Sequence, residues 1–297
     1  MANVLLGINN VIDIASFSGS YGSWLSTLPL ANLKKPQLGI VSRSTDLLAA
    51  STQFAINLTG VYNIRVLALC NHNLSLAATV KVTAYSDGSY STLVYDSGFL
   101  SAWDFAFSTG WGGWNDTTPG GALPHQYTIN NNRIDTRNYF TWNYAHVMRT
   151  TKVEARYWKV EIQDVGNTDG YVQIGRIFIG NAWEPTYNFD FGQSVGWENE
   201  TTVKYALNGS PYFDNKRPTR AAKFTLSHLS QQEAMQTVYS IFGYHGLDKE
   251  IFYMQDTDNV YDQHRTNFLC RLRSMTQISN EDFGDRYKAE FDLKESL

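Results

Sequence analysis

The chain has 297 residues, a formal net charge of -4 and two cysteines. This length suffices for one large or two medium domains. An acidic chain without a basic surface is not expected to bind nucleic acid, and two cysteines are too few for a disulfide-built scaffold. An aromatic content of 14% with only 18% charged residues is typical of β structure with polar but uncharged contact surfaces.

The N-terminal sequence MANVLLGINN has neither the basic leader nor the cleavage site of a signal peptide. No apolar run approaches the roughly 20 residues that a membrane-spanning helix needs. We therefore expect a protein that is made and assembled in a reducing cytoplasm. Cys70 and Cys270 lie in apolar runs, which predicts two buried free thiols.

Three strands are predicted at residues 53–58, 61–70 and 78–85. The first and third alternate apolar and polar residues, as half-buried strands do. Their inward-facing residues would be Phe54, Ile56 and Leu58 in the first strand and Val80, Val82 and Ala84 in the third. The second segment is apolar on both faces and predicts one central strand. The following SDGS sequence, residues 86–89, predicts a turn with a glycine available for a left-handed position.

A segment of different character spans roughly 99–148. It contains four of the eight tryptophans, is punctuated by glycine and proline, and shows no helical or strand period. We expect a long ordered loop, and such loops are usually functional or interfacial.

The stretch ARYWKVEIQDVGNTDGYVQIGRIFIGNAW, residues 155–183, predicts a β-hairpin. Trp158, Val160 and Ile162 would point into a core, and the Asp-Gly pair at 169–170 supplies turn chemistry. The alternation of the returning strand slips at Gly175, which predicts a β-bulge there.

Glu184-Pro185 is a plausible joint between two domains. Beyond it, residues 230–242 carry the strongest helix signal, because Ser230 and Glu233 form a capping box and Gly243 suits the C-terminal cap. Strands are expected on both sides, at 221–229, 250–256, 267–275 and 287–293. The fold prediction is mainly β: a jelly-roll sandwich over 1–182, then a smaller β-sandwich with one helix over 183–297.

The aromatic loop is the sharpest candidate for direct binding. Trp103, Trp111 and Trp114 could stack on sugar rings, while nearby carboxylates and amides accept hydrogen bonds from hydroxyls. The candidate set for glycan or subunit contact comprises Trp103, Asp104, Trp111, Trp114, Asn115 and Trp142. The alternative is that these tryptophans cap the sandwich or pack against a neighbouring subunit, since aromatic residues are enriched in interface cores.

No pattern predicts catalysis, a cofactor or a paired metal site. The acidic turn DTDNVYD offers Asp256, Asp258 and Asp262 as weak candidate metal ligands. It lacks the glycine and the closing glutamate of a calcium loop, so a solvated turn between strands fits better. We therefore expect a non-enzymatic protein.

Two blocks of the sequence resemble known families. The segments LPLANLKKPQLGIVSRSTD and LTGVYNIRVLALCNHNLSLAATVKVTAY, followed by RYWKVEIQD and GYVQIGRIFIG, resemble galactose-binding-like domains of the discoidin type. The versions in virion structural proteins of tailed bacteriophages are the most similar. The segments RAAKFTLSHLSQQEA, FLCRLRSM and AEFDLKESL resemble the tail-tube and distal-tail β-sandwich modules of long-tailed phages.

This resemblance implies a distal-tail or baseplate-type structural protein that forms a homo-oligomeric ring, six-fold or three-fold. Its partners would be the tail tube, hub or tape-measure proteins, and its location would be the virion, after assembly in the bacterial host cytoplasm. The galactose-binding-like domain comes first here, whereas in distal-tail proteins the ring-forming sandwich usually leads. The alternative function is a glycan-binding module that contacts a bacterial surface saccharide through Trp103, Trp111 and Trp114.

Overall fold

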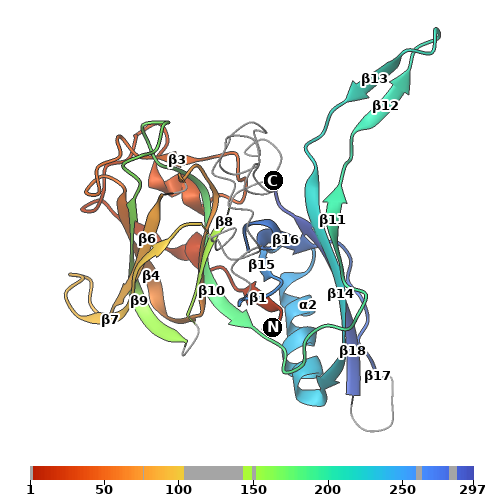
Figure 1. Cartoon of the computed structure of the whole chain (residues 1–297). Helices are drawn as coiled ribbons and strands as arrows, with labels where there is room; N and C mark the ends of the chain where they lie inside the picture. Colours follow the sequence, from red (N-terminus) through yellow and green to blue (C-terminus); the bar gives the residue numbers. More distant parts are fainter. Residues whose placement is uncertain (1–2, 76, 104–142, 149–151, 259–262, 281–285) are drawn as a thin grey trace, which may run out of the picture.

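The computed structural model describes residues 3–75, 77–103, 143–148, 152–258, 263–280 and 286–297 (Figure 1). The protein is mainly β, as predicted from the sequence. Within the described residues, the strands form a five-stranded sheet, a large curled sheet of eleven strands and a separate two-stranded hairpin.

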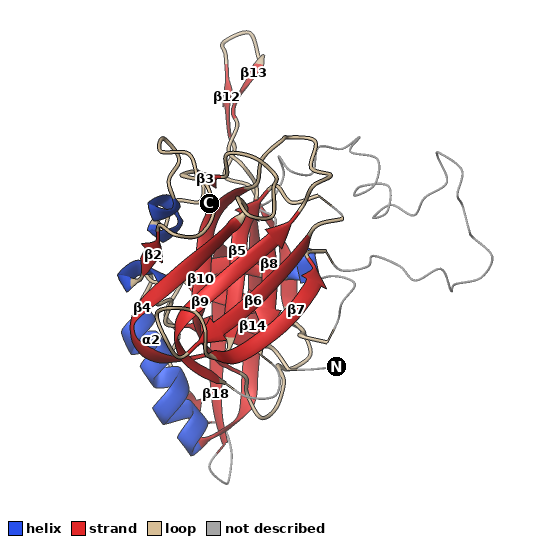
Figure 2. Ribbon diagram, turned by 90° about the vertical axis from the view of Figure 1, so that its left-hand side faces the viewer, coloured by secondary structure: helices blue, strands red, loops and turns tan. Residues whose placement is uncertain are grey.

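The first sandwich packs the five-stranded sheet against part of the large sheet, and Figure 2 views these layers face-on. The five strands, in spatial order, are β2 (Ser16–Ser18), β4 (Gln53–Ile64), β9 (Val153–Gln163), β6 (Thr79–Tyr85) and β7 (Leu93–Ser101). The opposing strands are β10 (Gln173–Trp183), β5 (Val66–His72) and β8 (Asn143–Val147), with β3 (Ser42–Arg43) on the edge of β10. Their inner faces share one core that contains Phe54, Val80, Trp158 and Ile177.

The two strands predicted as a hairpin do not pair with each other. β9 lies between β4 and β6, whereas β10 pairs with β1, β3 and β5 in the opposing sheet. Trp158, Val160 and Ile162 are fully buried, as predicted. Residues 164–172 therefore connect two sheets. Alternation identifies a strand and its inward face, but the strand's partner depends on distant segments.

The bulge predicted at Gly175 is wrong, because the pairing of β10 with β5 keeps one register along its whole length. The irregularity lies opposite, at Asn71 of β5, which has a left-handed φ of 55°. A Cβ atom on Gly175 would lie 2.4 Å from the carbonyl oxygen of Leu38. The glycine is required because another backbone segment approaches closely, which is the second usual reason for glycine in a strand.

Segment 61–70, predicted as one strand, is divided between two sheets. Strand β4 continues to Ile64 and β5 begins at Val66, so the chain changes sheet at Arg65. The backbone N–H of Arg65 donates to the carbonyl oxygen of Gly180 at 2.9 Å, outside the two strands' own ladders. The two halves differ in burial, since Val61 in β4 is 67% exposed whereas residues 66–70 of β5 are buried, but both carry apolar residues and the sequence pattern gives no sign of the crossing.

The turn at 86–89 connects β6 and β7, but its left-handed residue is Tyr90, with a φ of 56°, and not Gly88. Asp87 stabilises this conformation by accepting hydrogen bonds from the backbone N–H groups of Ser91 and Thr92, at 3.1 and 2.6 Å. An aspartate that bonds the following backbone replaces the glycine that the sequence pattern suggested.

The second half of the chain continues the large sheet. Its strands are β11 (Ser194–Glu198), β14 (Thr219–Ser230), β15 (Ile251–Met254), β16 (Phe268–Leu272), β17 (Ser279–Asn280) and β18 (Arg286–Glu295). Strand β1 (Leu5–Ile8) joins the halves because it pairs with β10 on one side and with β15 on the other. Val4 and Leu6 consequently pack in the second core, with Phe224 and Phe291.

The predicted helix covers the second core on one face of the sheet (Figure 1). It comprises the π-helical segment η4 (Glu233–Val238) and helix α2 (Tyr239–His245). The capping box is confirmed, since the Ser230 Oγ accepts from the backbone N–H of Glu233 at 3.2 Å and the Glu233 carboxylate accepts from the backbone N–H of Ser230 at 3.2 Å. The cap at Gly243 is wrong: the helix continues to His245, and Gly246, with a φ of 54°, takes the cap position.

The predictions for the two cysteines and for the long loop can also be compared with the structure. Both Cys70 and Cys270 are buried free thiols, as predicted. The long loop is shorter than predicted at both ends, because β7 extends to Ser101 and β8 occupies residues 143–147. Within the described ranges, no helix is long and apolar enough to cross a membrane.

Candidate functional site

A cleft of about 630 Å³ opens where the first sandwich meets the helical half of the chain. Its walls come from the segment after β1, from β4 and β10, and from the turn between α2 and β15. The side chains that line its outer part include Asn9, Asp13, Tyr62, Tyr244, Lys249 and Arg271. A volume of this size is in the range of small-molecule binding sites, about 300–1,000 Å³.

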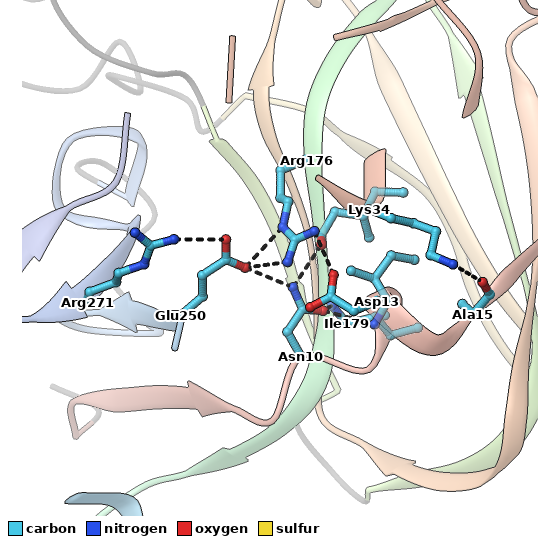
Figure 3. A network of polar contacts seen from close by, with 10 residues as sticks. Asn10, Asp13, Ala15, Lys34, Arg176, Ile179, Glu250 and Arg271 are labelled. Atoms are coloured by element: carbon cyan, nitrogen blue, oxygen red, sulfur yellow. Dashed lines mark hydrogen bonds and ion pairs between the residues drawn. The ribbon is translucent and has the colours of Figure 1, made fainter. Parts of the chain in front are cut away.

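A network of charges forms the floor of the cleft (Figure 3). The guanidinium of Arg176, on β10, donates to the Glu250 carboxylate from Nε at 3.0 Å and from Nη2 at 2.7 Å. Its Nη1 donates to Asp13 at 2.8 Å. The side-chain amide of Asn10 reaches the same Glu250 oxygen at 3.3 Å. Residues from three distant parts of the sequence thus converge on one buried guanidinium.

Burial and pairing act on Arg176 in opposite directions. Its side chain is 2% exposed and that of Glu250 is 5% exposed. Burial alone would lower the pKa of Arg176, but the hydrogen bond to Asp13 and the charge of Glu250 outweigh it and raise the pKa. The Arg176 guanidinium therefore stays charged at the junction of the two halves. There it can hold the two halves together or orient a bound ligand.

Two groups at the cleft wall have unused hydrogen-bonding capacity. Among the described residues, none makes a hydrogen bond of normal geometry to either ring nitrogen of His245, which is 1% exposed, or to Oε1 of Glu250. Nη2 of Arg271 forms a long ion pair with that oxygen, at 4.0 Å. Burial, followed by the Lys249 charge, lowers the pKa of His245 to about 4, although the backbone at Glu250 and the charge of Asp248 partly offset this. His245 is therefore neutral at pH 7.

A second hollow of about 460 Å³ adjoins the cleft along the helix, and the two share Asn9, Tyr244 and His245. The sequence did not identify this site, since its members are scattered between residues 9 and 271. The one local signal was a cluster of ionisable side chains directly after the helix, in the sequence YHGLDKE, residues 244–250. His245 has no other histidine or cysteine at metal-ligand spacing in the sequence.

Of the tryptophan candidates, the structure describes Trp103. Its indole N–H donates to the carbonyl oxygen of Leu74 at 3.2 Å, and its ring meets His72 edge-on at 5.5 Å. It packs against the first core, which matches the capping alternative for this residue. Asp104, Trp111, Trp114, Asn115 and Trp142 lie outside the described residues.

In the acidic turn after β15, Oδ1 of Asp256 accepts a hydrogen bond from the backbone N–H of Asp258 at 2.8 Å, which is ordinary turn geometry. Asp262 lies outside the described residues. In the part of the chain that the structure describes, no three histidine, cysteine or carboxylate side chains are grouped to hold a metal ion.

A second candidate surface is the hairpin of β12 (Thr202–Tyr205) and β13 (Pro211–Asp214), which projects away from the body (Figures 1 and 2). We call it the arm. Val203 pairs with Phe213 and Tyr205 pairs with Pro211, so these four apolar residues share one face. Thr202, Lys204, Tyr212 and Asp214 share the other.

No other part of the described chain covers the apolar face of the arm. Tyr205 is 73% exposed, Phe213 59% and Val203 42%. An isolated two-stranded hairpin is at best marginally stable in water, and a contiguous exposed apolar face usually marks an interaction site. The outer side of the helix is a further exposed apolar area, with Met235 and Tyr239 about one turn apart and 43% and 67% exposed.

No protein-family model and no curated protein matches this chain. Several solved structures are similar to it at low identity. One is the first family 32 carbohydrate-binding module of a family 31 glycoside hydrolase from Clostridium perfringens, with 11% identity over 58% of this chain and 98% of that one, at a TM-score of 0.35. Another is the family 32 module of NanJ from the same organism in complex with galactose, with 12% identity over 59% and 99%, at 0.36.

A third is a family 32 module of C. perfringens in complex with GlcNAc-α-1,4-galactose, with 14% identity over 58% of this chain and 94% of that one, at a TM-score of 0.33. At these identities and TM-scores, the similarity assigns no ligand and no site residue to the present chain.

Proposed function

We propose that this chain is a non-enzymatic assembly protein that forms a homo-oligomeric ring in the tail tip or baseplate of a bacteriophage. The observation that carries the proposal is the arm, an amphipathic hairpin whose apolar face has no cover within the described chain. Burial of this face against a partner would stabilise a hairpin that is only marginally stable alone.

The partner that we propose is a second copy of the chain. The arm points away from its own body in both views, so it cannot cover its own helix (Figures 1 and 2). Arm and helix face are different surfaces, as a heterologous contact requires, and heterologous contacts give a ring when the rotation between copies closes. The apolar face of the arm would pack on Met235 and Tyr239 of the next copy. The virion assignment itself rests on the sequence resemblance, and no solved structure compared above is a virion protein.

The assembly proposal predicts that two different variants fail alone and complement each other. Phe213→Asp disables the arm and Tyr239→Asp disables the receiving face, so each should sediment as a monomer in conditions where the unchanged chain forms a larger oligomer. Mixed together, they retain one intact contact and should form a 1:1 dimer. Val165→Asp, at a 77% exposed valine elsewhere, is the matched control.

Sedimentation velocity on the purified full chain measures the outcome. An unchanged chain that stays monomeric at high micromolar concentration would sink the proposal, and so would a mixture that does not dimerise. The virion assignment has a separate test in the flanking genes. A neighbouring tape-measure gene supports it, whereas a neighbourhood without any tail gene contradicts it.

The second candidate function is glycan binding through the loop that contains Trp111 and Trp114. It is kept because the solved structures compared above are carbohydrate-binding modules, two of them in complex with galactose-containing ligands. A glycan array with the unchanged chain and with Trp111→Ala tests it. Binding that the substitution abolishes supports this function, and background signal for the unchanged chain rejects it. The two functions are compatible, since a baseplate protein can also contact the host surface.

A further inference from the structure

We propose that the cleft between the two halves of the chain binds a neutral, polyhydroxylated small molecule of the saccharide class. This inference goes beyond the proposed assembly function and does not depend on the arm. It begins from His245 and Oε1 of Glu250, two buried groups to which no described residue makes a hydrogen bond of normal geometry, although Arg271 pairs with the oxygen at 4.0 Å. Leaving a buried polar atom without a partner is unfavourable, so two of them beside a hollow point to a bound group that satisfies them.

The size of the cleft fits such a molecule. Its volume of about 630 Å³ lies well inside the range of ligand sites, and the adjoining hollow adds about 460 Å³ along the helix. Both hollows border His245 and Tyr244, so a ligand of two or more rings could extend from one into the other. Tyr62 and Tyr244 supply apolar surface at the rim.

The charges of the lining select a neutral ligand. Asp13, Asp248 and Glu250 contribute three carboxylates, and Arg176, Lys249 and Arg271 contribute three cations. An ionic ligand would find as many charges of its own sign as of the opposite sign within the cleft, so little net attraction would offset the hydration that it loses on entry. A neutral molecule meets no such penalty.

The hydrogen-bonding groups of His245 and Glu250 favour a ligand that carries hydroxyl groups. Neutral His245 presents one ring N–H donor and one acceptor nitrogen, while Glu250 Oε1 presents an acceptor only. The ligand must therefore combine donors and acceptors over a short distance. Hydroxyl groups on adjacent carbons do this, because each donates one hydrogen bond and accepts others. Asn9 adds an amide group of the same dual character to the lining.

The test is a titration of the purified full chain with named sugars, followed by ligand-observed NMR. Galactose and N-acetylglucosamine should bind in the millimolar range typical of weak single-ring ligands, ~1 mM being about -4 kcal/mol. Galacturonate and glucosamine have the same ring frames with one charge added. They should bind at least tenfold more weakly if the balanced lining governs selection.

His245→Phe removes both ring nitrogens and keeps a ring of similar size, so it should weaken neutral-sugar binding at least tenfold. His228→Phe is the matched control, because His228 is exposed outside the cleft and should leave binding unchanged. Should His245→Phe fail to fold, Tyr244→Ala, at a side chain that is 57% exposed, takes its place with the same expectation.

Each outcome decides the matter. Binding that His245→Phe or Tyr244→Ala weakens and Trp111→Ala leaves intact supports the cleft and separates it from the tryptophan loop. No binding by the neutral sugars overturns the proposal. Binding that the cleft substitutions leave unchanged also overturns it, because the sugar then lies elsewhere. Neither result bears on whether the chain assembles through its arm.

Discussion

Replacing the buried pair at the bottom of the cleft should reveal how strongly the two halves of the chain are coupled. Glu250→Leu removes two hydrogen bonds, of 3.0 and 2.7 Å, from a guanidinium that is 2% exposed. Breaking a buried pair from one side costs about 3–5 kcal/mol, because the remaining charge has lost its compensation. We expect about 3 kcal/mol, the lower end, since Asp13 still contacts Arg176 and is half exposed to water.

The double variant separates the interaction from the loss of packing. Arg176→Met together with Glu250→Leu removes both charges and keeps apolar volume, and such replacements are often close to neutral. The double variant should therefore be more stable than Glu250→Leu alone. In a double-mutant cycle, the coupling energy between Arg176 and Glu250 should reach about 2 kcal/mol, within the range seen for residues in direct contact.

Urea unfolding followed by tryptophan fluorescence provides the free energies of unfolding. Lys223→Met is the control, because its partner Glu290 and its own side chain lie at the surface, 35% and 57% exposed. A surface pair of this kind contributes about 1 kcal/mol or less. If the two cleft substitutions add without coupling, the buried pair does not hold the halves together and the reasoning fails.

Two further predictions concern stability. Gly175→Ala places a Cβ 2.4 Å from the Leu38 carbonyl oxygen and should lower the free energy of unfolding in urea by about 2 kcal/mol. Gly166→Ala is the control, because open space surrounds Gly166, and it should change that free energy by less than about 0.5 kcal/mol. Equal stability of the two variants would contradict the close approach. Burial lowers the pKa of His72 to about 3 and, with the Lys249 charge, that of His245 to about 4. Because both values lie below the usual 6.5, the unfolded chain binds more protons, so stability is complete above about pH 7 and falls as the pH decreases toward 4. Between pH 7 and pH 5 the loss should be about 2 kcal/mol for each histidine. His245→Phe should remove about half of it, and a flat profile for the unchanged chain would rule the explanation out.

The sequence alone determined the class of the fold and most of its strands, because alternation and helix capping are local signals. Phe54, Val80 and Trp158 face the core as their spacing requires, and the Ser230–Glu233 box begins the helix where it was expected. Such features depend on residues only two to four positions apart.

Tertiary structure alone decided which strands pair and where the sites lie. Residues 155–163 and 173–183 look like a hairpin but belong to opposing sheets, since the partners of β9 and β10 are distant in sequence. Gly175 allows the backbone of Leu38 to approach closely, and no local sequence pattern indicates this contact. The cleft joins Asp13, Arg176 and Glu250 only because β1 pairs with both halves of the chain. A site assembled from segments so far apart in the sequence has no characteristic residue spacing that could identify it. It exists only once the sheet has formed.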